Sequence, residues 1–378
     1  MKHFLPLTLL GAALTFASCI QDEPLNAECD ITGIDSLWLS NHKAMIIGDP
    51  IVTNTTVSVT LKKGSDRTQL DPKFYLTPGA QIFITGEGTP ANGVVRDFTA
   101  PQLYTVCSED GNWSKDYTVS FNYPRPISVC SFEHYALDAS GKFYQWYEVD
   151  ASDEQNPRRD YWATGNAGFA MSGMAQTPEG YPTTPNPLGV RGNCVCLRTS
   201  DTGAFGASTR MPIAAGNIFI GEFKTSQAML FPRKATRMGL QLVGGEPVML
   251  TGYYKYTPGE VFYDKNKEVV EGRRDKCDVY AVLYEVDPAK FTPLNGDDVL
   301  TSNRIVSVAR LENPEEPKEW TKFELPFVMK EGKTFDRERM DNDGYAITVV
   351  ASSSRDGQVF EGAIGSELFI DELEIVWK

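Results

Sequence analysis

Apolar side chains recur at every second position along much of this chain, and no stretch shows a long 3.6-residue apolar period. In residues 56–61, for example, Val57, Val59 and Leu61 share one face, and three hydroxyl-bearing residues share the other. Such alternation is typical of half-buried β-strands. The 32 glycines and 23 prolines supply many turns, and aromatic residues make up 11% of the chain. These features together predict an all-β fold.

Two prolines divide the alternating segments into two groups. Pro124 and Pro126 follow a strand-like run at residues 117–121, and proline cannot continue a central strand. We therefore predict two domains. Residues 30–123 suit a small β-sandwich of short strands. Residues 127–378 contain about nine strand-like runs with irregular loops, which favours a jelly roll of two packed antiparallel sheets.

The first 18 residues are predicted to be an export signal. A basic start precedes an apolar run at residues 4–16, which is too short to span a bilayer. The segment that ends at Cys19 resembles a bacterial lipobox, and this resemblance implies lipidation of Cys19, with residues 19–29 as a tether. An ordinary signal with an incidental cysteine is the alternative. Acidic residues after Cys19 resemble the signal that directs Bacteroidetes lipoproteins to the outer face of the outer membrane, so we expect a lipid-anchored protein that faces the cell exterior.

Charge and composition exclude several classes of function. Lys and Arg total 36 against 50 Asp and Glu, which gives a formal net charge of −14. This charge disfavours binding to nucleic acids or to anionic lipid, so membrane attachment is expected only through the lipid anchor. The three histidines leave little room for histidine-based catalytic or zinc sites. The sequence also lacks the Gly-x-Ser-x-Gly, Walker and Rossmann motifs of common enzyme classes.

Six cysteines follow Cys19, an even number that permits disulfides in an exported chain. Their pairing pattern stays open. Cys194 and Cys196 are two positions apart on a predicted strand, so they point the same way and should not bond to each other. We expect most of these cysteines to be buried as small apolar side chains.

Four segments of the second predicted domain carry a family resemblance. They read Ala-Gly-Asn-Ile-Phe-Ile-Gly-Glu-Phe at 215–223, Gly-Tyr-Tyr-Lys-Tyr at 252–256, Ser-Ser-Ser-Arg-Asp-Gly at 352–357, and Phe-Glu-Gly-Ala-Ile-Gly-Ser-Glu-Leu-Phe-Ile-Asp-Glu-Leu at 360–373. In this order they are similar to the putative carbohydrate metabolism domain (PCMD) of Bacteroidetes. The resemblance implies a jelly roll like that of carbohydrate-binding modules. Glu246-Pro247 stands where the family usually has Arg-Pro; if that arginine contacts ligand, this chain recognises something different.

The first predicted domain carries a resemblance of its own. Residues 76–80 and 104–111 resemble an immunoglobulin-like domain of Bacteroidetes surface lipoproteins. No chemistry is evident in this domain, so we expect it to be a spacer that holds the second domain away from the membrane.

Two acidic residues are candidates for a structural calcium site. Strict alternation along residues 367–377 places Asp371 in the same inward row as Leu373 and Ile375, and Glu133 shares the register of the first strand of the same domain. A carboxylate in an inward row costs several kcal/mol unless it is paired or bound to a metal. Jelly-roll sugar-binding modules that this domain resembles often hold Ca²⁺ between their first and last strands. We therefore expect Glu133 and Asp371 to bind Ca²⁺, the alternatives being a salt bridge or hydrogen bonds to a loop.

Aromatic side chains are the candidates for carbohydrate recognition, because the C–H faces of a pyranose are apolar and stack on flat rings. One group lies in a region rich in Gly, Asp and Asn, and the other shares one face of a predicted strand. The five candidates are Trp146, Tyr161, Trp162, Tyr254 and Tyr256. The alternative for each is a place in the hydrophobic core, which is the usual position of an aromatic residue in a large β protein.

We expect a cell-surface lipoprotein that binds a glycan non-covalently, for glycan capture or adhesion beside a transporter or secreted hydrolases. A glycoside hydrolase is the first alternative, and it would need two opposed carboxylates. The acids considered for that role are Glu148, Asp150, Glu222 and Asp287, but none stands in a hydrolase motif, so no catalytic residue is assigned. A structural subunit of a surface assembly is the second alternative.

Overall fold

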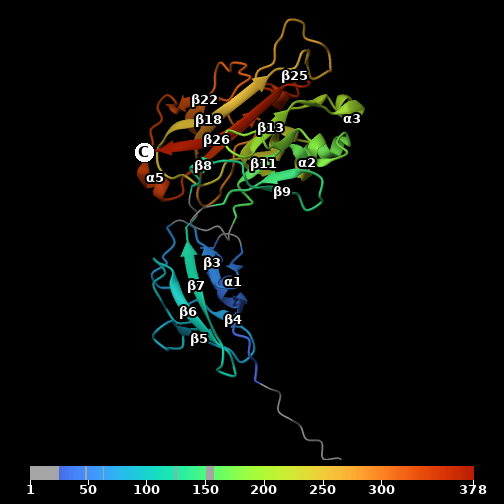
Figure 1. Cartoon of the computed structure of the whole chain (residues 1–378). Helices are drawn as coiled ribbons and strands as arrows, with labels where there is room; N and C mark the ends of the chain where they lie inside the picture. Colours follow the sequence, from blue (N-terminus) through green and yellow to red (C-terminus); the bar gives the residue numbers. More distant parts are fainter. Residues whose placement is uncertain (1–24, 47–48, 63, 124–125, 150–156) are drawn as a thin grey trace, which may run out of the picture. The chain divides into compact units, whose positions relative to one another are not determined.

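The computed structural model describes residues 25–46, 49–62, 64–123, 126–149 and 157–378. The predicted export signal, Cys19 and the carboxylate of Asp150 lie outside the described residues. The chain divides into two compact units, one formed by residues 1–60 and 66–122 and the other by residues 61–65 and 123–378. Figure 1 shows both units.

The first unit is built on a five-stranded sheet in the order β2-β3-β7-β6-β5, in which only β3 and β7 run parallel. A second pair of strands, β1 and β4, and one short helix, α1, accompany it. The alternation predicted around residue 57 is confirmed in β3, because Val57 and Val59 are fully buried. The elements are β1 (Ile31–Ile34), α1 (Ser36–His42), β2 (Ile51–Val52), β3 (Thr56–Thr60), β4 (Phe74–Leu76), β5 (Gln81–Ile84), β6 (Gln102–Cys107) and β7 (Ser114–Asn122).

The second unit contains two large antiparallel sheets. The seven-stranded sheet has the order β11-β16-β24-β20-β21-β23, with β17 also paired to β16. Its strands are β11 (Trp162–Thr164), β16 (Asn217–Phe223), β17 (Thr236–Met238), β20 (Asp278–Glu285), β21 (Ile305–Arg310), β23 (Val328–Met329) and β24 (Tyr345–Ser352).

The six-stranded sheet has the order β12-β13-β26-β18-β22, with β8 also paired to β26. Its strands are β8 (Val129–Cys130), β12 (Thr183–Asn186), β13 (Cys194–Arg198), β18 (Pro247–Thr257), β22 (Thr321–Pro326) and β26 (Glu367–Trp377). Short pairs join β9 (Tyr135–Leu137) to β10 (Tyr144–Trp146), β14 (Ser200–Asp201) to β15 (Ile213–Ala214), and β19 (Phe262–Tyr263) to β25 (Gly362–Ala363). The short helices are α2 (Asn166–Phe169), α3 (Gly203–Ser208), α4 (Pro232–Ala235) and α5 (Arg337–Asp341).

The main hydrophobic core combines inward-facing residues of both large sheets. From the seven-stranded sheet it takes Ile218, Ile220 and Val349, among others, and from the six-stranded sheet Leu250 and Ile370. Because alternate residues of each strand point to opposite faces, the same strands present a second set of side chains away from this core. The prediction of an all-β sandwich is confirmed, and the second face of the seven-stranded sheet carries a separate apolar cluster.

A β-bulge in β26 corrects the register that strict alternation predicts. Ile370 and Leu373 both face the core although they are three positions apart, and Glu372 between them has φ +50°. The pairing of β26 with β18 shifts at the same place. A bulge adds one residue to a strand and turns the following side chains to the other face. Asp371 therefore lies on the opposite face from Leu373 and Ile375, and not in an inward row with them.

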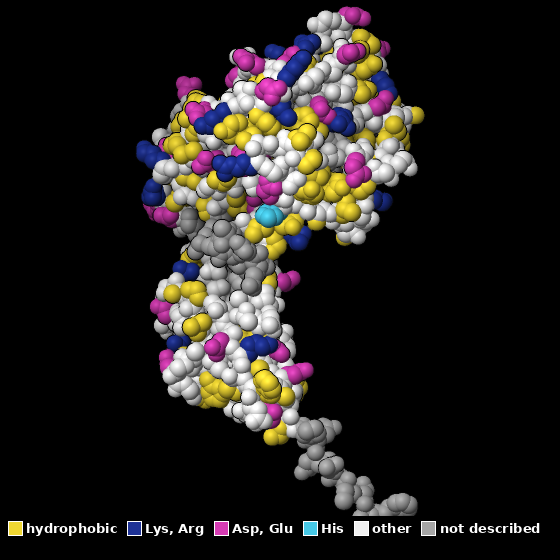
Figure 2. Space-filling model, viewed as in Figure 1, with side chains coloured by type: hydrophobic (Ala, Val, Ile, Leu, Met, Phe, Trp, Pro, Cys, Tyr) yellow, Lys and Arg dark blue, Asp and Glu magenta, His cyan; other side chains and the backbone are white. Residues whose placement is uncertain are grey.

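The six described cysteines after Cys19 are all free thiols. Five are buried, and Cys107 is half-buried, so the expectation that most are buried is confirmed. Within the described ranges, no helix is long and apolar enough to cross a membrane. Figure 2 shows acidic and basic side chains interspersed over the visible face of the second unit.

Candidate ligand-binding site

The five aromatic residues predicted to stack on sugar are all in the hydrophobic core. Trp146, Tyr161, Trp162, Tyr254 and Tyr256 are at most 6% exposed and belong to the cluster between the two sheets. A ring buried to this extent offers no face to a saccharide. The prediction of a sugar platform at these positions is therefore wrong, because the face of β18 that carries Tyr254 and Tyr256 is covered by the other sheet.

The two carboxylates predicted to bind Ca²⁺ both hold the loop that precedes β13. Glu133 accepts hydrogen bonds from the backbone N–H of Asn193 at 3.0 Å and from its side-chain amide at 2.9 Å. Asp371 accepts from the backbone N–H groups of Val190 at 2.6 Å and Arg191 at 3.4 Å. Burial raises the pKa of Asp371 to about 6, against the lowering effect of these hydrogen bonds.

These contacts fit the alternative of hydrogen bonds to a loop better than a calcium site. Ca²⁺ takes 6–8 oxygen ligands, whereas N–H donors already point at both carboxylates. Among the residues that the structure describes, no group of three or more His, Cys, Asp or Glu side chains could hold a metal ion. The present donor set does not fit a resident Ca²⁺, and calcium binding stays an untested prediction.

The described acids that were considered for hydrolysis differ in burial and in hydrogen-bond or ion-pair partners. Glu148 is buried in the core and accepts a 2.6 Å hydrogen bond from the indole N–H of Trp162. Burial raises the pKa of Glu148 to about 7. Glu222 is exposed and forms ion pairs with Lys224 at 2.8 Å and Arg237 at 3.3 Å, and Asp287 is exposed in a turn.

A cavity of about 220 Å³ lies on the face of the seven-stranded sheet that points away from the main core. Two rows of side chains across β16, β24 and β20 contribute to its lining, and each row follows the strand register. The first row is Asn217, Ser352 and Asp278, and the second is Phe219, Val350 and Tyr280. The same alternation that sends Ile218 and Val349 into the core therefore turns these residues toward the cavity.

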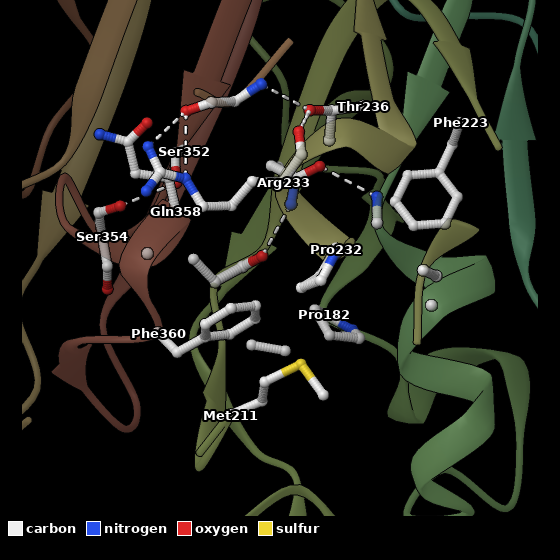
Figure 3. Close-up of a pocket in the computed structure, with 18 of the residues that line it drawn as sticks. Pro182, Met211, Phe223, Pro232, Arg233, Thr236, Ser352, Ser354, Gln358 and Phe360 are labelled. Carbon is white, nitrogen blue, oxygen red and sulfur yellow. Dashed lines mark hydrogen bonds between the residues drawn. The ribbon is translucent and has the colours of Figure 1, made fainter. Parts of the chain in front are cut away.

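Loops and short helices form the walls of the cavity. Residues of α2 and the turn after it, of α3, and of the segment that leads into α4 contribute Gly168, Met171, Phe205 and Met229. Phe223, at the end of β16, lines the cavity beside Gly168, where an added Cβ would approach the Phe223 ring to 3.0 Å. Figure 3 shows Phe223, Phe360, Met211, Pro182 and Pro232 around this space.

Phe360 reaches the cavity from a strained backbone position. Its φ of +63° is in the left-handed region, which residues other than glycine rarely adopt. This backbone conformation costs of order 1 kcal/mol or more. Strain of this kind persists only where the surroundings fix it. The surroundings here are a tight turn, in which the backbone N–H of Phe360 donates to the carbonyl of Gly357 at 3.0 Å.

A buried carboxylate ties down the two chain segments that flank this turn. Asp275 accepts hydrogen bonds from the hydroxyls of Ser354 at 2.5 Å and Ser366 at 2.7 Å, and from the backbone N–H of Ala363 at 2.8 Å. Burial raises the pKa of Asp275 even so. Because Ser354 precedes Phe360 and Ala363 follows it, Asp275 positions the loop that carries the ring.

Polar groups gather on one side of the cavity. The Arg233 guanidinium donates to the carbonyl of Gly296 at 2.9 Å and pairs with Asp297 at 3.0 Å. In Figure 3, Arg233 and Gln358 lie near Ser352 in the upper part of the view. Phe360, Met211 and Pro182 lie together in its lower part. Gln358 is exposed, and its amide makes no hydrogen bond within the described part of the chain.

The cavity lining contains one carboxylate among the described residues, and this carboxylate is fully engaged. Asp278 forms a bidentate pair with Arg310, at 2.9 and 2.7 Å, and lies 3.7 Å from Arg355. It is buried. A hydrolytic centre of the usual glycosidase kind needs two carboxylates that flank the scissile bond, and the described lining does not supply them.

Comparison with known proteins places this chain in a family. The family model of the putative carbohydrate metabolism domain, PCMD, matches residues 131–376. The chain belongs to the PCMD family. A model of the SGBP N-terminal domain matches residues 43–121, in the first unit of this PCMD protein. The resemblance inferred from the four segments is thus confirmed.

Two solved structures are similar to this PCMD protein. A putative glycoside hydrolase from Bacteroides thetaiotaomicron VPI-5482 shares 39% sequence identity, with a TM-score of 0.65, over 95% of this chain and 99% of that one. A putative glycoside hydrolase from Bacteroides vulgatus ATCC 8482 shares 38% identity, with a TM-score of 0.62, over 67% of this chain and 99% of that one. No curated protein matches the chain.

Three of the four segments that carry the PCMD resemblance meet at the cavity. Residues 215–223 contribute Asn217 and Phe223, residues 352–357 contribute Ser352 and Arg355, and residues 360–373 contribute Phe360. In the segment at 252–256, Tyr254 and Tyr256 lie in the core instead. Individual residue types do not reveal this site. The family segments were the only available signal, since residues 215–223 lie far along the chain from residues 352–373 and the structure brings them to one cavity.

Proposed function

We propose that this PCMD protein is a lipid-anchored cell-surface protein that binds carbohydrate without cleaving it, and that the cavity on the seven-stranded sheet is the binding site. The convergence of three family segments on one cavity carries this proposal. The SGBP match, which refers to surface glycan-binding proteins, supports a glycan-related place at the cell surface, with a glycan as ligand and glycan-uptake proteins as neighbours.

The chemistry of the cavity is suited to non-covalent binding. Phe360, Phe223 and Phe205 offer apolar surface, and Gln358 offers an unbonded amide to a hydroxyl group. Ligand pockets typically combine an apolar lining with a few polar groups that fix orientation. Asp278 is already held by Arg310 and is therefore a poor general acid or nucleophile.

Affinity electrophoresis in gels that contain plant, microbial or host polysaccharides tests this proposal. We expect one class of glycan to retard the full chain, and Phe360→Ala to weaken binding at least about tenfold, equivalent to about 1.4 kcal/mol. Val328→Ala, at an exposed position of the same sheet, is the matched control and should bind like the unaltered protein. Retardation that is equal in Phe360→Ala and the control would place the binding elsewhere and contradict the proposal.

Glycoside hydrolysis is the second candidate, because both similar structures are of putative glycoside hydrolases. Incubation of the retained glycan with the full chain, followed by measurement of new reducing ends, separates the two functions. We expect no release of reducing sugar. Steady release that is lost in Asp278→Asn, while glycan binding is kept, would favour the hydrolase.

A further inference from the structure

We infer that the cavity takes up an apolar substituent of a glycan, such as an aryl group or a short acyl or alkyl chain, while the sugar ring lies at the side of Gln358 and Arg233. This inference rests on the proposed function and narrows the ligand class. It follows from three features: the hydrogen bonds that the polar lining side chains already make, the volume of the cavity, and the exposed apolar side chains at its rim.

Three polar side chains on the sheet side of the cavity, which forms its floor, are already bonded within the protein. The Asn217 side chain accepts from the backbone N–H of Gly165 at 2.9 Å and donates to the carbonyl of Ala215 at 3.0 Å. The hydroxyl of Ser352 donates to the carbonyl of Ser354 at 2.9 Å, and that of Thr236 donates to the carbonyl of Arg233 at 2.8 Å. These groups have little capacity left for a ligand.

An unsubstituted pyranose is a poor occupant of such a floor. It carries hydroxyls around its whole rim, and each polar group buried without a partner costs about 1–3 kcal/mol. Against the floor it would meet Phe219, Val350 and Met238, which offer no hydrogen bond. An apolar substituent has no such cost and gains from leaving water.

The size of the cavity agrees with this occupant. Its volume is about 220 Å³, and an apolar cavity of about 150 Å³ is enough to bind benzene. Four methionines contribute to the lining, namely Met171, Met211, Met229 and Met238. Their flexible, polarizable side chains can adjust to substituents of different shape.

The rim of the cavity is also apolar and exposed. Phe205 and Met229, which line the cavity, are 44% and 57% exposed, and Leu230 beside Met229 is 79% exposed. Exposed apolar side chains that are gathered around a hollow are typical of a binding site for an apolar group. Gln358 supplies the free amide that hydroxyls of the sugar would need on the polar side.

Isothermal titration of the full chain with matched glycosides tests the inference. The probes are the phenyl and methyl β-glycosides of glucose, galactose, mannose and xylose, with free phenol as a further ligand. We expect the phenyl glycoside of a recognised sugar to bind at least tenfold more tightly than its methyl glycoside, and more tightly than phenol.

Two variants that fill the cavity, Val350→Phe and Met211→Trp, should abolish this difference. Val328→Phe, the same change at an exposed site of the same sheet, should keep it. Met211 is half-buried on a loop, so its variant keeps the test interpretable if Val350→Phe does not fold.

The outcomes separate this inference from the proposed function. Equal binding of phenyl and methyl glycosides, weakened equally by Phe360→Ala, would overturn the inference and leave carbohydrate binding at the cavity intact. Phenol that binds as tightly as every phenyl glycoside would overturn both, because the sugar would then contribute nothing. A phenyl preference that persists in both filled variants would place the substituent outside the cavity and overturn the inference.

Discussion

Replacing Glu148 by Gln should remove a pH-dependent cost from the folded state. Glu148 is 5% exposed, and burial raises its pKa from the ordinary value of 4.5 to about 7. The folded protein therefore binds more protons than the unfolded chain between these two values, and stability falls as the pH rises through this window. Since each pH unit is worth about 1.4 kcal/mol, the cost at pH 8.5 is roughly 3 kcal/mol.

The glutamine variant keeps the size of the side chain and an oxygen that can accept from the Trp162 indole, 2.6 Å away in the native protein. We expect Glu148→Gln to gain roughly 2–3 kcal/mol relative to the unaltered protein between pH 5 and pH 8.5. Urea unfolding followed by fluorescence at each pH measures this difference. Glu222→Gln, at an exposed position, serves as control. A difference between Glu148→Gln and the unaltered protein that does not change with pH would refute the reasoning.

Three further changes test other contacts. Asp275→Asn should lower the free energy of unfolding in urea by about 1–3 kcal/mol, because an N–H₂ group would face donors that now bind an oxygen; a loss no larger than in exposed Asp160→Asn would contradict this role. Arg310→Ala should cost up to about 3 kcal/mol in the same assay by leaving Asp278 without its bidentate partner, and adding Asp278→Asn should restore part of it. EDTA should leave the melting temperature unchanged, since the carboxylate oxygens of Glu133 and Asp371 already accept hydrogen bonds from N–H donors. A clear rise of the melting temperature with CaCl₂ would instead support a calcium site.

Much of the strand content of the second unit could be predicted from the sequence. The strand-like runs at residues 217–223, 278–285 and 345–352 form β16, β20 and β24, of which β20 and β24 are the central strands of the seven-stranded sheet. These strands are covered on both faces over much of their length, so their continuous apolar composition is a direct consequence of burial.

The register of β26 could not be predicted, because a local bulge decides it. The backbone at Glu372 adopts φ +50°, and a glutamate in a strand-like run gives no warning of this conformation. Strict alternation therefore placed Asp371 on the wrong face. Bulges depend on pairing with neighbouring strands, which a single sequence does not show.

The roles of the aromatic residues were also beyond the sequence. Tyr254 and Tyr253 are neighbours of the same type, and alternation shows only that they face opposite ways. Which face is covered depends on the second sheet, whose strands come from distant parts of the chain. Phe360, in contrast, is brought to the cavity by a tight turn and a distant aspartate, and neither leaves a periodic pattern.

The separation between the main core and the cavity has a consequence for how such proteins diversify. Ile218 and Ile220 hold the sandwich together from one side of β16, whereas Phe219 between them serves the cavity on the other. Loops supply most of the remaining wall, and loops tolerate insertions and exchanges better than packed strands do. Proteins that share this scaffold can therefore change their ligand specificity through sequence changes in these loops, with little loss of folding stability.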